Sequence, residues 1–551
     1  GSGVLVQENF YADITDNYFD RVRAGVQPDN YNRANPGTTG SIRRNTINAW
    51  RRGIFHNQWY ADASAITVED NTITAVPYPG AGKWTGIWLG SFQGNASTTI
   101  KNNTITIPDN ITFTGTGYAA GYDVWNDSPT SAITIEGGTV NGGDYGVFVN
   151  NFEGYNTNAN NTSITIKGVT SHNARVAGVY VLDSPSNTNK ATVAATIQNA
   201  IIDGAETGIL VDGVDVSAVA HNNSITNSTT AAVTNNSDAV MDASANWWGA
   251  ATADDVAAAI GAKVDYNPWF NSGDSAQVGF QGDYSFLNVG NDSPQTGTVL
   301  AINEGIGLAK EKGTVNVWDG TYYGAVMVDR PVTLQSQNGP DVSILHGGET
   351  SPAIYVVSIR ASDVTLKGFT VTDPLFNSPG ADVIGIAIGY YGDNELSNIK
   401  VLNNIVTAIG APNRDLTTTN DWPSVGIVLN GVVDGVEIAN NVVHDLHQIV
   451  STQDVNYGPT GIGIYGYDTT PLSTNVNVHD NEIYNISATN KNGAEAISNG
   501  IRFGWGSGNG TIANNLVYDV DGRGIHLTPT NNGSVTVESN EVYNSAVAGI
   551  A

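Results

Sequence analysis

The chain has 551 residues, and 52 acidic against 23 basic side chains give it a formal net charge of -29. A chain this acidic, without a basic stripe to replace phosphate counterions, is not expected to bind nucleic acid. The lack of cysteine excludes disulfides and cysteine-ligated metals, and no apolar run approaches the roughly 20 residues that cross a bilayer, so no membrane insertion is expected.

One motif recurs along the chain: an aliphatic residue, two variable positions, Asn, one variable position and an apolar residue. In the first half its asparagines are Asn17, Asn45, Asn71 and Asn103, and in the second half they are Asn404, Asn441, Asn481, Asn515 and Asn540. The second-half asparagines are separated by 37, 40, 34 and 25 residues. Such regular recurrence indicates a repeat architecture.

A second motif, Gly followed by Ile or Val and a short alternating run, comes after many of these asparagines. Examples are Gly53-Ile54, Gly86-Ile87, Gly146-Val147, Gly178-Val179, Gly426-Ile427, Gly461-Ile462, Gly500-Ile501 and Gly524-Ile525. Each repeat therefore contains two or three short strands, and stacking the repeats in parallel lets every inward aliphatic side chain meet a neighbour above and below. We expect the asparagines to occupy left-handed bends and to form a hydrogen-bonded ladder along the axis.

These units resemble the parallel β-helix repeats of the pectate-lyase-like superfamily, in the form found in bacterial and archaeal surface proteins. The resemblance implies an all-β fold of two tandem right-handed parallel β-helices, with short capping helices at their junction. It implies little about function, because this fold carries lyases, hydrolases, epimerases, adhesins and surface-layer proteins.

The repeat breaks once, which predicts a first β-helix over residues 1–270, a linker over 271–293 and a second β-helix over 294–551. Asn246-Trp247-Trp248-Gly249, an Ala-rich stretch at 252–262 and Asn267-Pro268-Trp269-Phe270 predict an aromatic and helical cap. A sugar-binding role for the Trp pair is the alternative. An apolar face over 298–312 predicts the helix that opens the second β-helix. Neither end of the chain carries such a cap, so we expect it to be part of a longer array.

The second β-helix offers one reactive-looking patch. Alternation on the Gly-Ile strands places Arg502 and His526 on successive coils, near Asp519 and Asp521. An Arg beside a His and carboxylates has the groups needed to neutralise a uronate and move its α-proton. An ordinary salt-bridged surface is the alternative, and the catalytic signatures of pectate lyases, alginate epimerases and polygalacturonases are missing.

The first β-helix shows an apolar stripe instead. Its expected outward positions are Phe55, Trp88, Phe148, Tyr180 and Leu210, and Trp84, Trp125, Trp59 and Tyr60 lie nearby in the sequence. Either loops cover this stripe, or it is a contact surface for sugar rings or for another protein. As ligand-binding candidates we take Phe55, Trp88, Phe148, Tyr180, Trp84 and Trp125.

No cofactor is expected, although the acidic loops around Asp123, Asp127, Asp393 and Asp421 are compatible with calcium. The sequence favours a structural or adhesive module of a large secreted or cell-surface protein, in a surface layer or matrix, with neighbouring modules or polysaccharide as partners. The second hypothesis is a polysaccharide lyase or epimerase acting through Arg502, His526, Asp519 and Asp521. A tailspike-like depolymerase is the third.

Overall fold

The structure is a computed structural model. It describes residues 1–551 apart from 8–10, 31–38, 59–63, 79, 81, 92–95, 114–115, 127–131, 152–161, 185–191, 275–278, 349–354, 376–382, 391–394, 417–422, 451–457, 466–472, 491–496, 505–507 and 529–532. The chain divides into two compact units, the first formed by 1–283 with 292–298 and the second by 284–291 with 299–551.

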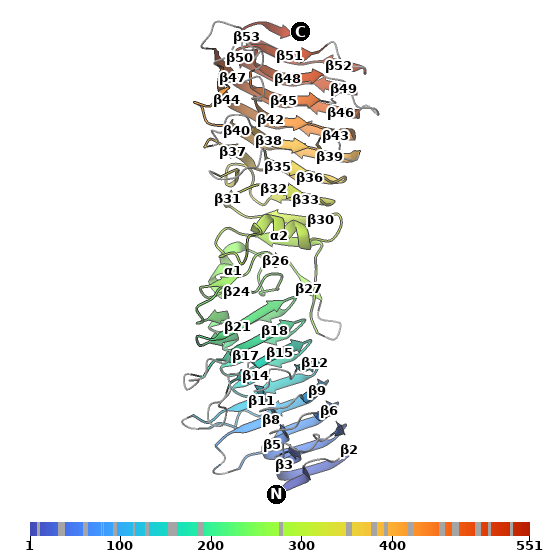
Figure 1. Ribbon diagram of the computed structural model, residues 1–551, viewed down its shortest axis with the longest axis vertical. Coiled ribbons are helices and arrows are strands. Elements are labelled where there is room, and N and C mark those ends of the chain that lie inside the picture. Colours follow the sequence, from blue (N-terminus) through green and yellow to red (C-terminus); the bar gives the residue numbers. More distant parts are fainter. Residues whose placement is uncertain are drawn as a thin grey trace. The chain divides into compact units, whose positions relative to one another are not determined.

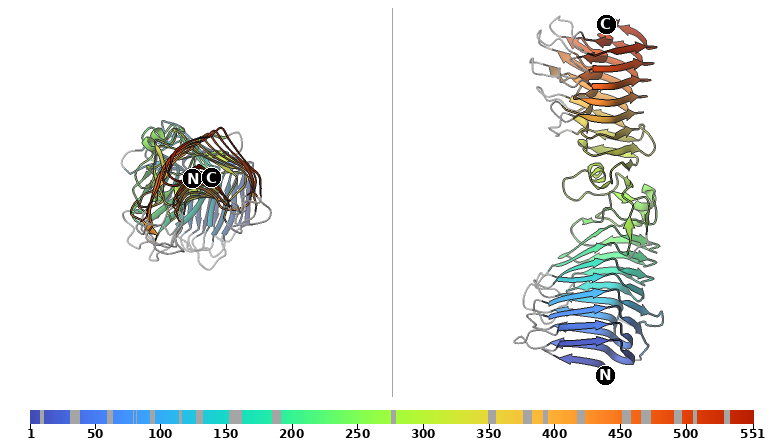
Figure 2. Two further views of the ribbon diagram at one scale, coloured as in Figure 1. Left: turned by 90° about the horizontal axis from the view of Figure 1, so that it is seen from above. Right: turned by 90° about the vertical axis from the view of Figure 1, so that its right-hand side faces the viewer.

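In both units short strands of successive coils pair in parallel, as Figures 1 and 2 show. One sheet of the first unit contains β3 (Tyr18–Asn30), β5 (Thr46–Gln58), β8 (Trp84–Ser91), β11 (Ala119–Asn126), β14 (Tyr145–Asn150), β17 (Ala177–Leu182), β20 (Thr207–Asp212) and β23 (Ala231–Asn235). Another runs from β2 (Tyr11–Thr15) to β25 (Val264–Asp265). Among the described residues, the one antiparallel strand pair is the hairpin of β27 (Gly273–Asp274) and β28 (Gln281–Gly282). The predicted all-β parallel β-helix fold is confirmed.

The second unit repeats this arrangement. One of its sheets contains β32 (Val326–Val328), β35 (Tyr355–Ile359), β38 (Val383–Ile388), β42 (Ser424–Leu429), β45 (Thr460–Tyr465), β48 (Asn499–Gly504), β51 (Arg523–Leu527) and β54 (Ala548–Ile550). The others run from β29 (Phe286–Val289) to β52 (Val535–Glu538) and from β31 (Gly320–Tyr323) to β53 (Glu541–Ser545).

The core of each unit is a stack of aliphatic side chains in register. In the first unit Ile47 pairs with Ile73, Ile73 with Ile105 and Ile105 with Val140, and all four are completely buried. Each coil alone would leave these side chains open to water, so burial of apolar surface between coils is the main force that orders the repeats.

The predicted asparagine ladder is present, and each rung is a side-chain amide that donates to the next. Nδ2 of Asn45 lies 3.0 Å from Oδ1 of Asn71, and Nδ2 of Asn71 lies 2.9 Å from Oδ1 of Asn103. In the second unit the chain of bonds runs from Asn404 through Asn441, Asn481 and Asn515 to Asn540, with distances of 2.9–3.1 Å. Asn223 and Asn246 form a further rung that the motif search missed.

The ladder asparagines do not themselves adopt the left-handed conformation, contrary to expectation. The preceding residue does: φ is 56° at Asp70, 50° at Asn102 and 55° at Asn440. The bend is thus made by an exposed residue, while the following Asn turns its amide inward. In the first unit the ladder is interrupted after Asn103, because Gly138 occupies the next rung.

Both predicted helices are present, α1 (Ala253–Ala259) in the first unit and α2 (Ala301–Leu308) in the second, and the aromatic side chains Trp248, Trp269 and Phe270 of the first unit are buried. Of the Trp pair, Trp248 is thus a packing residue, whereas Trp247 is half-buried. The prediction of a linker over 271–293 is wrong. Phe280 is buried within the first unit. Phe286–Val289 forms β29, which pairs with β30 (Gly313–Val317), so the second unit already includes residues that precede its predicted start at 294.

Candidate functional site

One outward-facing column of side chains runs across the first unit. In register it contains Phe55 of β5, Trp88 of β8, Asp123 of β11, Phe148 of β14 and Tyr180 of β17. We call the outward side of these five strands the aromatic face. The register confirms the alignment expected for Phe55, Trp88, Phe148, Tyr180 and Leu210, and it adds a carboxylate at the centre that was considered only for calcium.

Much of the aromatic face is covered. Phe55, Trp88 and Phe148 are 8%, 3% and 7% exposed, and the Phe55 and Trp88 rings stack with their centroids 4.5 Å apart. These three rings therefore cannot serve as open platforms for a sugar, which corrects the binding role predicted for them. Trp125 and Tyr180 remain half-buried.

Trp84 does not belong to this surface. It is completely buried, and its indole N–H donates to the carbonyl oxygen of Ala49 at 3.0 Å. Trp84 is a core residue, so its predicted role in ligand contact is wrong. Trp59 and Tyr60 lie outside the described residues.

A polar cluster lies in the middle of the aromatic face. The carboxylate of Asp123 is completely buried; it accepts a hydrogen bond from the Tyr118 hydroxyl at 2.8 Å and another from Nδ2 of Asn150 at 3.2 Å. Nζ of Lys83 lies 3.5 Å from Oδ2 of Asp123 and 3.1 Å from the Tyr118 oxygen. Burial raises the pKa of Asp123 and lowers the pKa of Lys83, because both charged forms lose hydration there.

Three arginines gather at the edge of the aromatic face, on β3 and β5. Arg23 is exposed, and Arg51 and Arg52 are half-buried. Burial, followed by the charges of Arg51 and Arg23, lowers the pKa of Arg52 to about 10. Among the described residues no ion pair joins these three side chains to a carboxylate, and the buried Nε of Arg52 has no hydrogen-bond acceptor.

A compositional signal for this cluster exists and was missed. Residues 1–60 contain seven basic side chains, all arginine, against five acidic ones, in a chain whose net charge is -29. Arg43 and Arg44 are neutralised by Glu69 and Asp16, at 3.0 Å and 2.8 Å. Of the other described arginines in this stretch, Arg23, Arg51 and Arg52 lie beside the aromatic face.

The second unit places Arg502 and His526 side by side, since β48 and β51 pair these residues directly. Nδ1 of His526 lies 3.1 Å from Oδ1 of Asn499, and burial together with Arg523 and Arg502 lowers the pKa of His526 to about 4. The imidazole is thus neutral at pH 7. The Arg502 guanidinium lies 5.6 Å from the ring centroid of Tyr465, which is buried.

The carboxylates predicted for this patch do not join it. Asp519 and Asp521 are both exposed, and Asp519 accepts a hydrogen bond from Nδ2 of Asn544 at 3.0 Å. Neither contributes to the lowered pKa of His526. Asp519 lies in β50 (Leu516–Val520), which belongs to another sheet, and Asp521 lies in the bend between β50 and β51, so neither carboxylate is on the sheet that carries Arg502 and His526.

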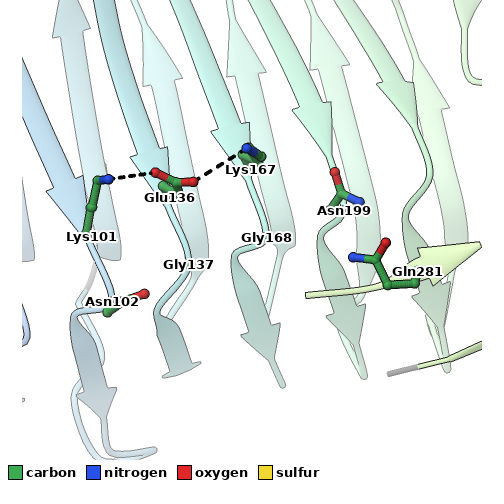
Figure 3. A pocket seen from close by; sticks show the side chains of 8 residues that line it. All are labelled: Lys101, Asn102, Glu136, Gly137, Lys167, Gly168, Asn199 and Gln281. Atoms are coloured by element: carbon green, nitrogen blue, oxygen red, sulfur yellow. Dashed lines mark hydrogen bonds and ion pairs between the residues drawn. The ribbon is translucent and has the colours of Figure 1, made fainter. Parts of the chain in front are cut away.

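An alternating ladder of charges follows one corner of the first unit. Arg43, Glu69, Lys101, Glu136 and Lys167 occupy equivalent positions on successive coils. Lys101 and Lys167 lie 3.0 Å and 3.5 Å from Glu136, at the edge of an open hollow of about 390 Å³ that Gln281 borders on its other side (Figure 3). Each of these charges is already paired with a charge on a neighbouring coil, so the ladder serves to stabilise coil stacking and we do not assign a ligand to this hollow.

No group of His, Asp and Glu side chains suited to a metal ion occurs among the described residues. Asp123 lies in the polar cluster described above, and Asp127, Asp393 and Asp421 fall outside the described part of the chain. Within that same part, no helix is both long and apolar enough to cross a bilayer.

No protein-family model matches the chain. It is similar to the uncharacterized protein YwoF of Bacillus subtilis (strain 168), with 25% identity over 312 residues, and the match covers 49% of this chain and 64% of that protein. The match therefore spans less than two thirds of that relative.

Among solved structures, the chain is similar to the PL6 family alginate lyase AlyGC, with a TM-score of 0.22, 11% identity and 98% of each chain covered. A point mutant of the same enzyme gives a TM-score of 0.21 and 8% identity, with 99% of this chain and 97% of that chain covered. The fold assignment rests on the parallel strand pairing of the chain itself.

Proposed function

We propose that this chain is a structural and adhesive module of a larger secreted or cell-surface protein, and that its first unit binds acidic polysaccharide at the edge of the aromatic face. The observation that carries this proposal is the group of unpaired arginines Arg23, Arg51 and Arg52, of which Arg52 lies over the covered rings of Phe55 and Trp88. Guanidinium groups bind carboxylates in a bidentate manner, which suits the carboxylates of an acidic polysaccharide.

Charge repulsion supports an anionic ligand. Arg51 and Arg23 each lower the pKa of Arg52, which means that the three cations destabilise one another in the free protein. A uronate carboxylate placed among them would relieve that repulsion. The Arg52 guanidinium already lies 4.2 Å from the ring centroid of Phe55, which holds it at the face.

The proposal predicts that Arg51→Ala/Arg52→Ala weakens binding to polygalacturonate by at least about tenfold, the loss expected for about 1.4 kcal/mol. The matched control is Arg43→Ala/Arg44→Ala, which removes the same charge from arginines already paired with Glu69 and Asp16. Affinity electrophoresis in gels containing polygalacturonate measures both. Equal losses in the two variants would show that net charge, rather than this site, governs binding.

Polysaccharide lyase or epimerase activity is the second candidate, favoured by the direct pairing of Arg502 with His526. With Nδ1 beside the Asn499 oxygen, Nε2 of the neutral imidazole is left to accept a proton. The low pKa of His526 makes it a weak base, and the two predicted carboxylates point elsewhere. A lyase would form an unsaturated, ultraviolet-absorbing product from the same polysaccharides, and Arg502→Ala and His526→Ala would abolish it.

A further inference from the structure

We propose that the side chains of Lys83 and Asp123 condense to an amide, which would cross-link neighbouring coils of the first unit beneath the aromatic face. Lys83 directly precedes β8, and Asp123 lies in β11, the strand that pairs with β8. Nζ of Lys83 lies 3.5 Å from Oδ2 of Asp123. The pairing of β8 with β11 thus holds the two groups near contact.

The site favours the uncharged forms that this reaction needs. An amine attacks a carboxyl group only when the amine is deprotonated and the acid is protonated. Burial lowers the pKa of Lys83 and raises the pKa of Asp123, so desolvation shifts both groups in that direction. The Lys83 nitrogen lies 4.9 Å and 5.1 Å from the ring centroids of Trp125 and Tyr118, which limit its contact with water.

Two further side chains are placed to assist. The Tyr118 hydroxyl contacts both reactants, at 3.1 Å from Nζ of Lys83 and 2.8 Å from Oδ2 of Asp123. It can accept the proton that leaves the attacking nitrogen while giving its own to the departing oxygen. Nδ2 of Asn150 donates to Oδ1 of Asp123, the oxygen on which negative charge develops.

The reaction balances without a cofactor or a change of oxidation state. One C–N bond forms between Nζ of Lys83 and Cγ of Asp123, one C–O bond of the carboxyl group breaks, and one water molecule leaves. The Lys83 side chain is 24% exposed, which gives that water a route out. In a chain without cysteine, the amide would be a covalent tie between coils that needs no oxidant.

The nearby pair of Lys101 and Glu136 provides an internal comparison. These groups lie 3.0 Å apart, closer than Lys83 and Asp123, but their side chains are 41% and 39% exposed. Both groups stay hydrated at this exposure, so proximity alone does not make them reactive. The cross-link is therefore expected at Lys83 and not at Lys101.

The test is the intact mass of the purified chain after incubation at neutral pH. We expect a mass lower than the sequence mass by one water molecule. Trypsin should then fail to cleave after Lys83 and release a branched species that joins residues 53–101 to residues 102–167. A full sequence mass, with ordinary cleavage after Lys83, would overturn the proposal and leave an ion pair.

Variants locate the amide bond and test the proton transfer assigned to the Tyr118 hydroxyl. Lys83→Arg and Asp123→Ala should have full mass, Lys101→Arg should still lose one water, and Tyr118→Phe should form the amide at least tenfold more slowly. Loss of the water in Lys83→Arg would place the reaction elsewhere and overturn the assignment. The arginines proposed to bind polysaccharide take no part, so either proposal can fail alone.

Discussion

His56 is a buried polar side chain that destabilises the first unit at acid pH. It points into the core beside Leu89, is 3% exposed, and its Nε2 has no hydrogen-bond partner among the described residues. Burial lowers its pKa from 6.5 to about 4. Between pH 6.5 and about 4, the unfolded chain therefore binds a proton at His56 that the folded chain does not bind.

This shift predicts an acid-dependent loss of stability. Above pH 6.5 His56 is neutral in both states and has no pH effect, whereas between pH 6.5 and about 4 the unfolded state binds more protons and the free energy of unfolding falls, by up to roughly 3 kcal/mol. His56→Leu should reduce this slope and stabilise the chain at pH 5, as measured by urea unfolding at pH 7.5 and pH 5. His172→Gln, at a partly exposed histidine, is the control; an unchanged slope in His56→Leu would contradict the burial argument.

The residue scale is also where sequence reasoning was weakest. Alternation on the Gly-Ile strands aligned Phe55, Trp88 and Phe148 correctly, but it could not reveal that they are covered. It also could not show that Trp84 faces the core, because Trp84 lies before the Gly at which the alternation begins. Asp123 was not predicted as part of this column, because its coil carries a carboxylate where the neighbouring coils carry the aromatic residues Trp88 and Phe148.

The repeating element is a corner in which two residues have separate tasks. The first takes the left-handed conformation and faces solvent, as Asn440 does with φ of 55°, and the second turns its amide inward. Nδ2 of Asn441 donates to Oδ1 of Asn481 and to the Val401 carbonyl, while its Oδ1 accepts from Asn404. The ladder satisfies backbone groups that each bend would otherwise leave buried without partners.

We predict that Asn441→Ala lowers the free energy of unfolding by about 3 kcal/mol, because the buried Val401 carbonyl and Asn404 N–H both lose their partner. Asn540→Ala, at the half-buried last rung, should cost about 1 kcal/mol. Chemical unfolding followed by circular dichroism compares them. Equal losses would mean that the ladder does not stabilise through burial.

At this scale the sequence was informative. The spacing of Asn404, Asn441 and Asn481 identified the parallel coils and their register, because a repeat must place equivalent residues on top of one another. The error over β29 has a physical reason: Phe286–Val289 carries no Gly-Ile pair, and Asn288, although it accepts a hydrogen bond from Nδ2 of Asn316 at 3.0 Å, does not stand in the recurring Asn motif.

Across the molecule, charge is distributed unevenly. The chain as a whole repels polyanions, yet residues 1–60 carry a small excess of arginine, and three of these arginines lie together without carboxylate partners among the described residues. Long-range repulsion and local attraction respond differently to salt, since exposed charges are screened over about 10 Å at 0.1 M ionic strength. Affinity for polygalacturonate therefore reports the local site most clearly at moderate salt.

The most direct measurement is a crystal structure of the chain soaked with an oligogalacturonide. We predict sugar electron density at the edge of the aromatic face, with a carboxylate within hydrogen-bonding distance of Arg51 or Arg52. Density over Arg502 and His526 instead, or at neither place, would contradict it.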